Sequence, residues 1–149
     1  MKVDTDILVI EWDQSKWLVV SSFFFLLPSL YAFYNNLHFH SLLLVTTSLV
    51  SANYWRKACI SWRRDLDLIF SKISFVVFFH NGVMYIEYKH FWVSVYCFSG
   101  LILLVYFYYL SGKLFEEKNR HWCKYHFLFH LMVMYEQGLV IHSLLRREN

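Results

Sequence analysis

Residues 99–110 of the chain read SGLILLVYFYYL, and every position after Gly100 in this stretch is apolar or aromatic. Because apolar residues would cover every face of a helix built from it, the stretch does not resemble an amphipathic helix of a soluble protein. A transmembrane β-strand would instead alternate apolar and polar residues. A second stretch, SSFFFLLPSLYAFY at 21–34, has the same character. Both stretches predict helices that cross a membrane.

Five such segments are present in the chain. A bilayer core of about 30 Å needs about 20 apolar helical residues, and five stretches approach this length, at residues 17–34, 37–55, 66–86, 91–110 and 125–145. The sequence therefore predicts an all-α, polytopic bundle of five transmembrane helices within a single domain of residues 1–149. Pro28 should kink the first helix, because proline has no backbone N–H to donate.

The composition agrees with an integral, multi-pass membrane protein. Hydrophobic residues make up 58% of the chain, aromatic residues 21% and charged residues only 17%. A disordered or nucleic-acid-binding chain would be polar or broadly basic, so neither class is expected and no nucleic-acid partner is predicted. The three cysteines have no paired spacing and are predicted to be free thiols. Which membrane holds the chain, and its oligomeric state, are left open by the sequence.

The basic residues predict an orientation. With the N-terminus in the cytosol, ten Lys and Arg residues outside the spans are cytosolic and three are on the opposite side. The cytosolic ten are Lys2, Lys16, Arg56, Lys57, Arg63, Arg64, Lys113, Lys118, Arg120 and Lys124, and the other three are Lys89, Arg146 and Arg147. Cytosolic loops of membrane proteins are enriched in Lys and Arg, so the N-terminus is predicted inside and the C-terminus outside.

Polar side chains inside these spans are candidates for function, because ionisable groups are costly in a bilayer. Ser51 lies on one helix face with Trp55, near the end of the second span. Asp65 and Asp67 open the third span, where carboxylates also complement the helix dipole without any functional role. Lys72 lies deeper and either extends to the interface or pairs within the bundle, for example with Glu136.

The fifth span begins with a histidine pair. His126 and His130 are four residues apart, so both imidazoles leave the same helix face and could bind one metal ion, and Cys123 lies on the same stripe. The alternative is a pair of interfacial histidines that are hydrogen-bonded to neighbouring groups. The predicted topology places Ser51, Asp67 and the histidine pair at a similar depth on the cytosolic side.

A Ser near the end of one span, an Asp opening the next and a His-xxx-His in the last resembles the superfamily of alkaline ceramidases and adiponectin/progestin-type receptors. The similarity covers SLVSANYWRKACISWRRDLDLIF and KYHFLFHLMVMYEQGLVIH, the segments at 48–70 and 124–142. The resemblance implies a zinc site that hydrolyses lipid amides such as ceramide. It also implies that Ser51 stabilises the oxyanion, that Asp67 handles the proton of the zinc-bound water, and that His126 and His130 bind the metal.

Two departures from this pattern are visible in the sequence. The family has a histidine four residues after the Ser, where this chain has Trp55, and it has seven spans where five are predicted here. One hypothesis is therefore a reduced zinc-dependent hydrolase of a membrane lipid amide or ester, with Cys123, His121 or an acid such as Asp65 as the third ligand. The competing hypothesis is a non-catalytic membrane protein that binds lipid or a membrane protein partner, which Trp55 favours.

The charge count makes a prediction about topology. The N-terminus and the loop at 113–124 should be cytosolic, and the C-terminus should lie on the opposite side, because of the ten-to-three distribution of Lys and Arg. Reporter tags at the two ends, read by protease protection in intact membranes, check it. Two tags in the same compartment would contradict an odd number of spans, and exchanged compartments would contradict the orientation.

Overall fold

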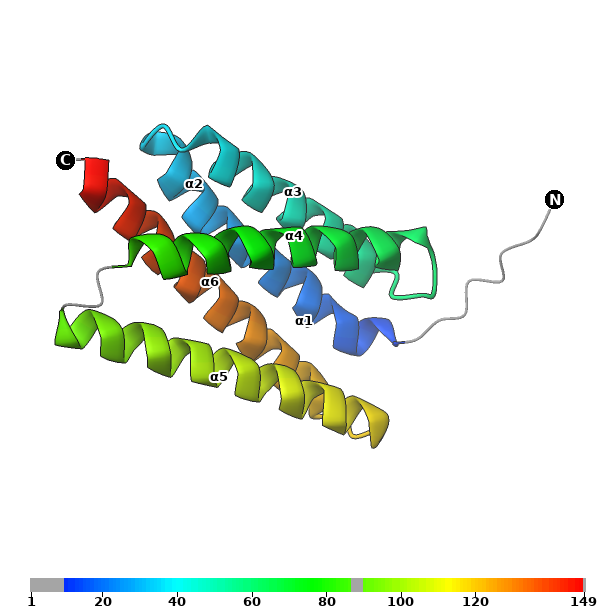
Figure 1. Ribbon diagram of the computed structural model, residues 1–149. Coiled ribbons are helices and arrows are strands. Elements are labelled where there is room, and N and C mark those ends of the chain that lie inside the picture. The colour runs from blue at the N-terminus through cyan, green and yellow to red at the C-terminus, as the bar shows by residue number, and fades with distance from the viewer. Residues whose placement is uncertain (1–9, 87–89, 149) are drawn as a thin grey trace.

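The computed structural model describes residues 10–86 and 90–148, and these form a bundle of five helical rods (Figure 1). The first rod has three parts, α1 (Trp12–Ser22), the 3-10 turn η1 (Phe23–Phe25) and α2 (Leu26–Tyr34). The other four rods are α3 (His38–Arg56), α4 (Trp62–Tyr85), α5 (Phe91–Glu116) and α6 (Trp122–Glu148). The predicted all-helical fold is confirmed, and each predicted span falls on one rod.

Four of these rods are long and apolar enough to cross a membrane, among the residues that the structure describes. They are the first rod (Trp12–Tyr34), α4, α5 and the Trp122–Arg146 part of α6. The helix α3 has 19 residues, so it is about 28 Å long at 1.5 Å per residue. It is not among the four because serine, threonine and histidine make it more polar. The structure therefore supports an integral membrane protein. That α3 also crosses the membrane stays a prediction.

A 3-10 turn lies next to Pro28, where the sequence predicts a kink. Pro28 lies in the first turn of α2, and η1 immediately precedes that helix. Since proline cannot donate a backbone hydrogen bond, the carbonyl four residues earlier, on Phe24, receives none from it. Phe24 is the middle residue of η1. The tighter turn therefore sits where the α-helical hydrogen bonding is interrupted.

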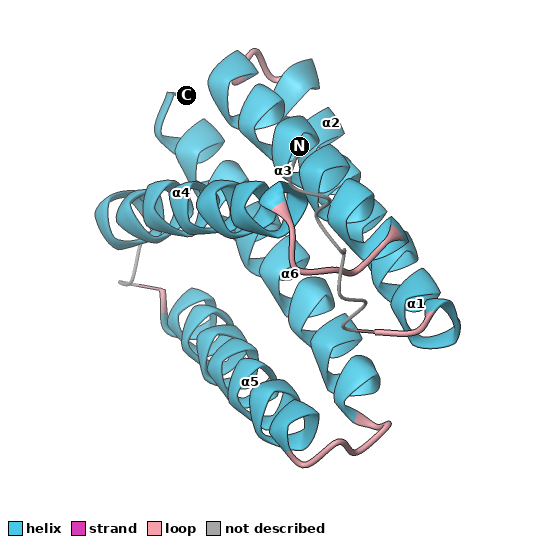
Figure 2. Ribbon diagram, turned by 90° about the vertical axis from the view of Figure 1, so that its right-hand side faces the viewer, coloured by secondary structure: helices cyan, strands magenta, loops and turns pink. Residues whose placement is uncertain are grey.

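The helix α6 is the centre of the bundle. It contacts α1, α2, α4 and α5, whereas α5 contacts α6 alone among the described helices. No Cα atoms of α4 and α5 come within 8 Å of each other, although the two helices follow one another along the chain. Figure 2 shows this separation, with α4 and α5 leaving α6 in different directions. The position of α5 therefore depends entirely on its contact with α6.

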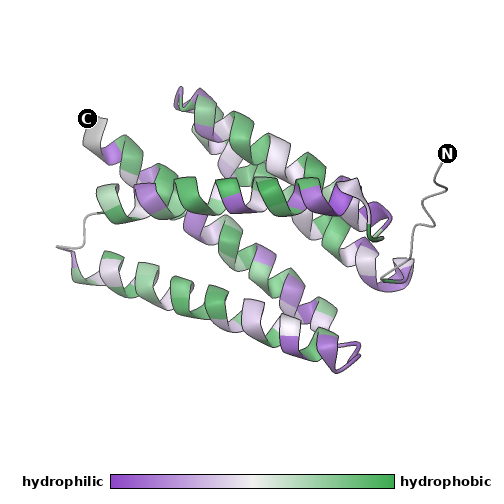
Figure 3. Cartoon of the chain, turned by 45° about the vertical axis from the view of Figure 1, so that its right-hand side comes forward, coloured by the Kyte–Doolittle hydropathy of each residue, from purple (hydrophilic) through white to green (hydrophobic). Residues whose placement is uncertain are grey.

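The interior contains two apolar clusters with polar residues between them. One cluster, at the end where α2 meets α3, includes Leu44, Phe78 and Ile141. The other, at the opposite end, includes Leu18, Trp55 and Trp122. The buried polar residues that lie between these clusters along the helices are Ser21, Ser22, Ser29, Thr47, Ser48, Ser51, Ser74, His130 and Gln137. In Figure 3 the hydrophilic colour likewise recurs along α6, in addition to the turns and helix ends.

The contact between α5 and α6 includes a close approach at Gly100. A Cβ atom added to this buried glycine would collide with Oε1 of Glu136 on α6 and would lie 3.0 Å from its Cδ. Oε1 of Glu136 is buried and has no hydrogen-bond partner. Lys72 is exposed, and the described part of the chain contains no ion pair between it and Glu136. Of the two alternatives for Lys72, the structure favours extension away from the interior.

Gly100→Ala should destabilise the protein, because the added methyl group must displace the Glu136 carboxyl. Because the obstacle is the end of a flexible glutamate side chain, the cost should lie near the lower end of the about 1–3 kcal/mol that overpacking takes. Gly112→Ala is the matched control on the same helix, since nothing lies within 4 Å of its added Cβ. That variant should be neutral or gain up to about 1 kcal/mol of helix propensity. Thermal unfolding in detergent compares the two.

The Glu136→Ala background provides the second half of this test. Removal of the carboxyl should abolish most of the cost of Gly100→Ala, because the obstacle is then gone. Equal melting temperatures for the two glycine variants, or an undiminished cost in the Glu136→Ala background, would contradict the close approach.

Candidate functional site

A seam of serine hydroxyls joins the first rod to α3. Ser22 donates toward Oγ of Ser51 at 3.1 Å, and Ser48 donates to the backbone carbonyl of Ser22 at 2.8 Å. Ser22 also lies 2.7 Å from the carbonyl oxygen of Leu18. All three serines are at most 3% exposed. Small polar residues of this kind let two helices approach closely and hydrogen-bond across the interface.

The serine seam continues to Asp67 on α4. The hydroxyl of Ser51 lies near the Asp67 carboxyl, whose Oδ1 atom is buried with no hydrogen-bond partner. Asp65 is different, because it is exposed in the first turn of α4. Asp65 therefore suits the role of an acid that complements the helix dipole. Asp67, in the second turn, faces the interior and carries a vacant hydrogen-bond acceptor.

The histidine pair lies across the interior on α6. The imidazoles of His126 and His130 are 4.9 Å apart between centroids, with an angle of 61° between their planes. Nδ1 of His130 is 2.8 Å from Oγ of Ser21, and Nδ1 of His126 is 3.1 Å from Oγ of Ser111 on α5. Since Ser21 adjoins Ser22 in the sequence, the serine seam connects His130 with Ser51 and Asp67.

Trp55 packs directly against the histidine pair. Its ring centroid is 5.1 Å from that of His126 in an edge-to-face arrangement, and its side chain is 7% exposed. The ring of Trp122 on α6 contacts both of these rings. Its centroid is 6.2 Å from that of Trp55 and 6.0 Å from that of His126. Nε1 of Trp55 is buried with no hydrogen-bond partner. An apolar ring therefore occupies the position where the resemblance would place a third imidazole.

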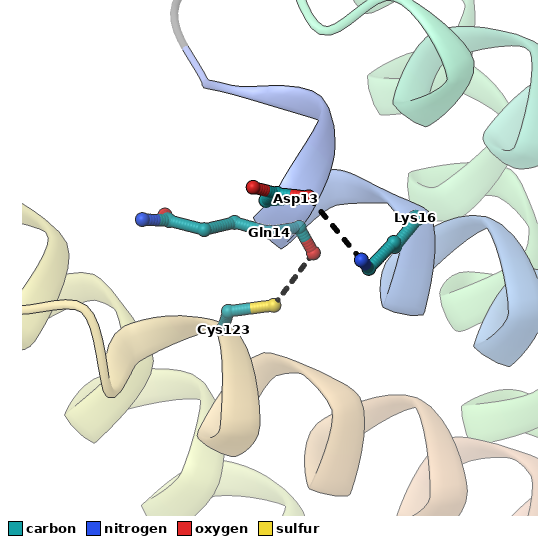
Figure 4. Close-up of polar contacts among 4 residues, drawn as sticks. All are labelled: Asp13, Gln14, Lys16 and Cys123. Atoms are coloured by element: carbon teal, nitrogen blue, oxygen red, sulfur yellow. Dashed lines mark hydrogen bonds and ion pairs between the residues drawn. The ribbon is translucent and has the colours of Figure 1, made fainter.

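The further candidate ligands lie apart from this arrangement. The thiol of Cys123 donates to the backbone carbonyl of Gln14 at 3.0 Å, so it joins the start of α6 to α1 (Figure 4). His121 is exposed, and its backbone N–H bonds the side chain of Asn119 at 3.0 Å. Within the described ranges, no group of three or more His, Cys, Asp or Glu side chains is arranged to hold a metal ion.

Of the four residues singled out from the sequence, Ser51 lies beside Asp67, and His126 lies beside His130. The two pairs are linked indirectly, through Ser22 and Ser21 of α1. Sequence reasoning missed the serines that connect them, Ser21, Ser22 and Ser111. The sequence did contain a signal for Ser21 and Ser22, because these adjacent polar residues lie within an apolar span. Nothing in the local sequence, however, indicates which helix those hydroxyls would face.

The assembly partly fits a zinc ion. Imidazole nitrogens are preferred zinc ligands, and catalytic sites usually combine three protein ligands with one open position. Here two imidazoles are available, each with its Nδ1 already bonded to a serine, and the vacant Oδ1 of Asp67 could accept a proton. Because Trp55 stands where the resemblance would place a third histidine, only two histidine ligands are available.

Comparison of the chain with protein-family models, with curated proteins and with solved structures gave no match.

Ser51→Ala should destabilise the protein, because the buried hydroxyl of Ser22 would lose its partner on α3 and the Asp67 carboxyl would lose a neighbouring hydroxyl. An unsatisfied buried polar group costs about 1–3 kcal/mol, and more when it is charged. Ser99→Ala is the control, since Ser99 is exposed and bonds only the carbonyl of Tyr96 on its own helix. Chemical or thermal unfolding in detergent measures both. A Ser51→Ala variant as stable as Ser99→Ala would contradict the serine seam.

Proposed function

We propose that the chain is a five-span integral membrane protein that binds zinc through His126 and His130 and hydrolyses the amide or ester of a membrane lipid. The observation that carries this proposal is that the adjacent residues Ser21 and Ser22 of α1 bond His130 on α6 and Ser51 on α3, respectively, with Asp67 of α4 beside Ser51. Ser51, Asp67 and the histidine pair are the residues that the resemblance to alkaline ceramidases and adiponectin/progestin-type receptors assigns to chemistry. These contacts between helices are tertiary features that spacing within one helix cannot produce.

The direction of the helices supports the proposed orientation. The beginnings of α1, α4 and α6 and the ends of α3 and α5 lie at one end of the bundle (Figure 1). Nine of the ten basic residues counted for the cytosolic side lie within the described ranges, and they gather at this end. The site lies nearer to this end than to the other, since Trp55 ends α3 there and Trp122 begins α6 there. A lipid would present its polar group to the site from the cytosolic leaflet.

Each side chain has a proposed role in hydrolysis. Bound zinc supplies Lewis-acid polarisation of the lipid carbonyl and lowers the pKa of water. Asp67 accepts a proton at Oδ1, which is buried and has no competing hydrogen bond. Ser51 lies beside the Asp67 carboxyl and, with Ser22 bonded to it, offers a hydroxyl to stabilise a developing oxyanion. Trp55 and Trp122 exclude bulk water from the histidine pair.

A second candidate function is lipid binding without catalysis, and Trp55 is the observation that favours it. The ring packs 5.1 Å from His126 and fills the place of a third ligand. Two imidazoles alone bind zinc weakly, and an aromatic ring hinders the approach of water. In this alternative the polar residues hold a lipid headgroup or only stabilise the bundle.

Zinc content separates the two candidates. The purified protein should bind zinc, and the His126→Ala, His130→Ala double variant should not, because these imidazoles are the proposed ligands. Trp55→His should raise zinc affinity about 10-fold or more, since a third imidazole supplies the usual number of protein ligands. Equilibrium dialysis with metal analysis measures all three proteins.

His80→Ala is the control for loss of a histidine, because His80 is exposed on α4 and distant in sequence from the site. Equal zinc content in the wild type and the double variant would refute the metal site. Zinc binding without turnover of lipid amides or esters in mixed micelles would favour the second candidate.

A further inference from the structure

A groove opens at the end of the bundle where α1 begins and the chain turns from α5 into α6. Its volume is about 470 Å³, which lies within the about 300–1,000 Å³ of sites for small molecules. No residue of the serine seam and neither imidazole of the histidine pair lines it. We call it the basic groove, and the side chains that line it include Gln14, Phe115, Glu116, Lys118, Arg120 and Trp122.

Exposed tryptophans mark the depth of the basic groove in the membrane. Trp12, Trp17 and Trp62 are between 55% and 62% exposed. Trp12 begins α1 and Trp62 begins α4, and both helices begin at the end of the bundle where α5 turns into α6 (Figure 1). Exposed tryptophans gather where a membrane meets water. A ligand in the groove therefore lies at the level of the lipid headgroups and not among the acyl chains.

One wall of the basic groove is fixed by contacts between helices. Trp122 is 5% exposed, and its ring meets that of Phe115 edge to face, with 5.2 Å between centroids. An indole N–H only donates, so the side-chain oxygen of Gln14, 3.0 Å away, accepts from Trp122. The Gln14 side chain extends away from Asp13 and Lys16 (Figure 4), and its amide nitrogen makes no hydrogen bond within the described residues. The groove therefore has an aromatic wall with an unused amide donor beside it.

The turn that carries Lys118 does not require a lysine. Lys118 follows α5 with a φ of 55°, a left-handed conformation in which glycine is the usual residue after a helix. Asn36 is the other non-glycine residue with positive φ among the described residues, and asparagine tolerates this conformation. Lys113 already places a basic group in the last turn of α5, where it complements the helix dipole. Neither the turn nor the dipole therefore explains the lysine at 118, which lines the groove.

The charges of the basic groove sum to a single positive charge. Lys118 and Arg120 are exposed, and neither forms an ion pair with a carboxylate of the described residues. Glu116 contributes one negative charge to the same groove. A headgroup with one negative charge therefore balances the groove, whereas a second negative charge would be repelled by the Glu116 carboxylate. Basic pockets between membrane helices on the cytosolic side are known to bind anionic lipid headgroups.

We propose that the basic groove binds the headgroup of a phospholipid that carries one negative charge, such as phosphatidylglycerol. Lys118 and Arg120 bind the phosphodiester, to which ammonium and guanidinium groups donate charge-assisted hydrogen bonds. The amide of Gln14 adds a neutral donor, and Glu116 accepts hydrogen bonds from the hydroxyl groups of the headgroup. This site is separate from the histidine pair and requires no metal ion, so it goes beyond the proposed hydrolysis.

Lipid binding to the purified chain in detergent tests the proposal. Native mass spectrometry should show that phosphatidylglycerol binds at least about 5-fold more tightly than phosphatidylcholine, and Lys118→Gly and Arg120→Gln should each weaken its binding about 5-fold. Lys118→Gly should be at least as heat-stable as the wild type, because glycine adopts a positive φ without strain. A loss of lipid binding in this variant therefore cannot come from a loss of the fold.

Two further variants distinguish the basic groove from general surface charge. Lys124→Gln removes the same charge as Arg120→Gln, but Lys124 is exposed, lies outside the groove and is about 200° around α6 from Trp122. It should leave the binding of phosphatidylglycerol nearly unchanged. Glu116→Gln should strengthen the binding of phosphatidic acid, whose headgroup can carry a second negative charge, because the repulsion from the carboxylate is removed.

Any of the following results would overturn the proposal. Equal binding of phosphatidylglycerol and phosphatidylcholine, or undiminished phosphatidylglycerol binding in Lys118→Gly and Arg120→Gln, would show that the groove does not hold the headgroup. Equal losses in Lys124→Gln and Arg120→Gln would show that only the overall surface charge matters. A rise in melting temperature with inorganic phosphate equal to that with phosphatidylglycerol would identify a free anion as the ligand in place of a lipid.

Discussion

The structure depends on one constraint, which is that a hydroxyl or carboxyl placed among apolar helices must find its hydrogen-bond partner within the protein. The seam from Ser48 and Ser22 to Ser51 meets this constraint between the first rod and α3. Farther along the same two helices, Ser29 hydrogen-bonds the hydroxyl and the carbonyl of Ser41. Because these bonds cross from helix to helix, they fix the register of α3 against the first rod. That register places Ser51 opposite Asp67 and Trp55 opposite His126.

The same constraint explains why the remaining unpaired groups concentrate around α6. Buried atoms without a partner in the described part of the chain include Oδ1 of Asp67 and Nε1 of Trp55 near the histidine pair. Two others, Oε1 of Glu136 and Oε1 of Gln137, lie deeper along α6. The serines of the seam are all hydrogen-bonded, whereas these four buried atoms have no partner within the described residues. This contrast distinguishes them from the polar residues that hold helices together.

Two of the contacts that the helix α5 makes with α6 lie far apart along both helices. The helix contacts only α6, and its approach is permitted by Gly100, where the Glu136 carboxyl occupies the space of a side chain. About three turns further along, the same helix brings Ser111 to His126.

Much of the fold follows from the sequence, because hydrophobicity over about 20 residues is a local property. Stretches such as 99–110 and 21–34 predicted helices at the observed places, and the 3-10 turn of the first rod lies next to Pro28. The spacing of His126 and His130 likewise predicted a shared face, which is a consequence of helix geometry alone. The helix α3 is the exception among the spans, since its serines and threonines lower its apolarity. Those residues serve contacts between helices, which a hydropathy pattern does not register.

The partners of each polar side chain were decided only by the tertiary structure. Asp65 and Asp67 are equivalent candidates in the sequence, and it is the rotation of α4 that exposes one and turns the other toward Ser51. The contacts of Ser21 and Ser111 with the histidine pair depend on how α1 and α5 pack against α6, across separations of 109 and 15 residues. Periodicity determines which residues share a face of one helix. Which face meets which is determined by packing and by the requirement that buried polar groups be satisfied, and both depend on the whole bundle at once.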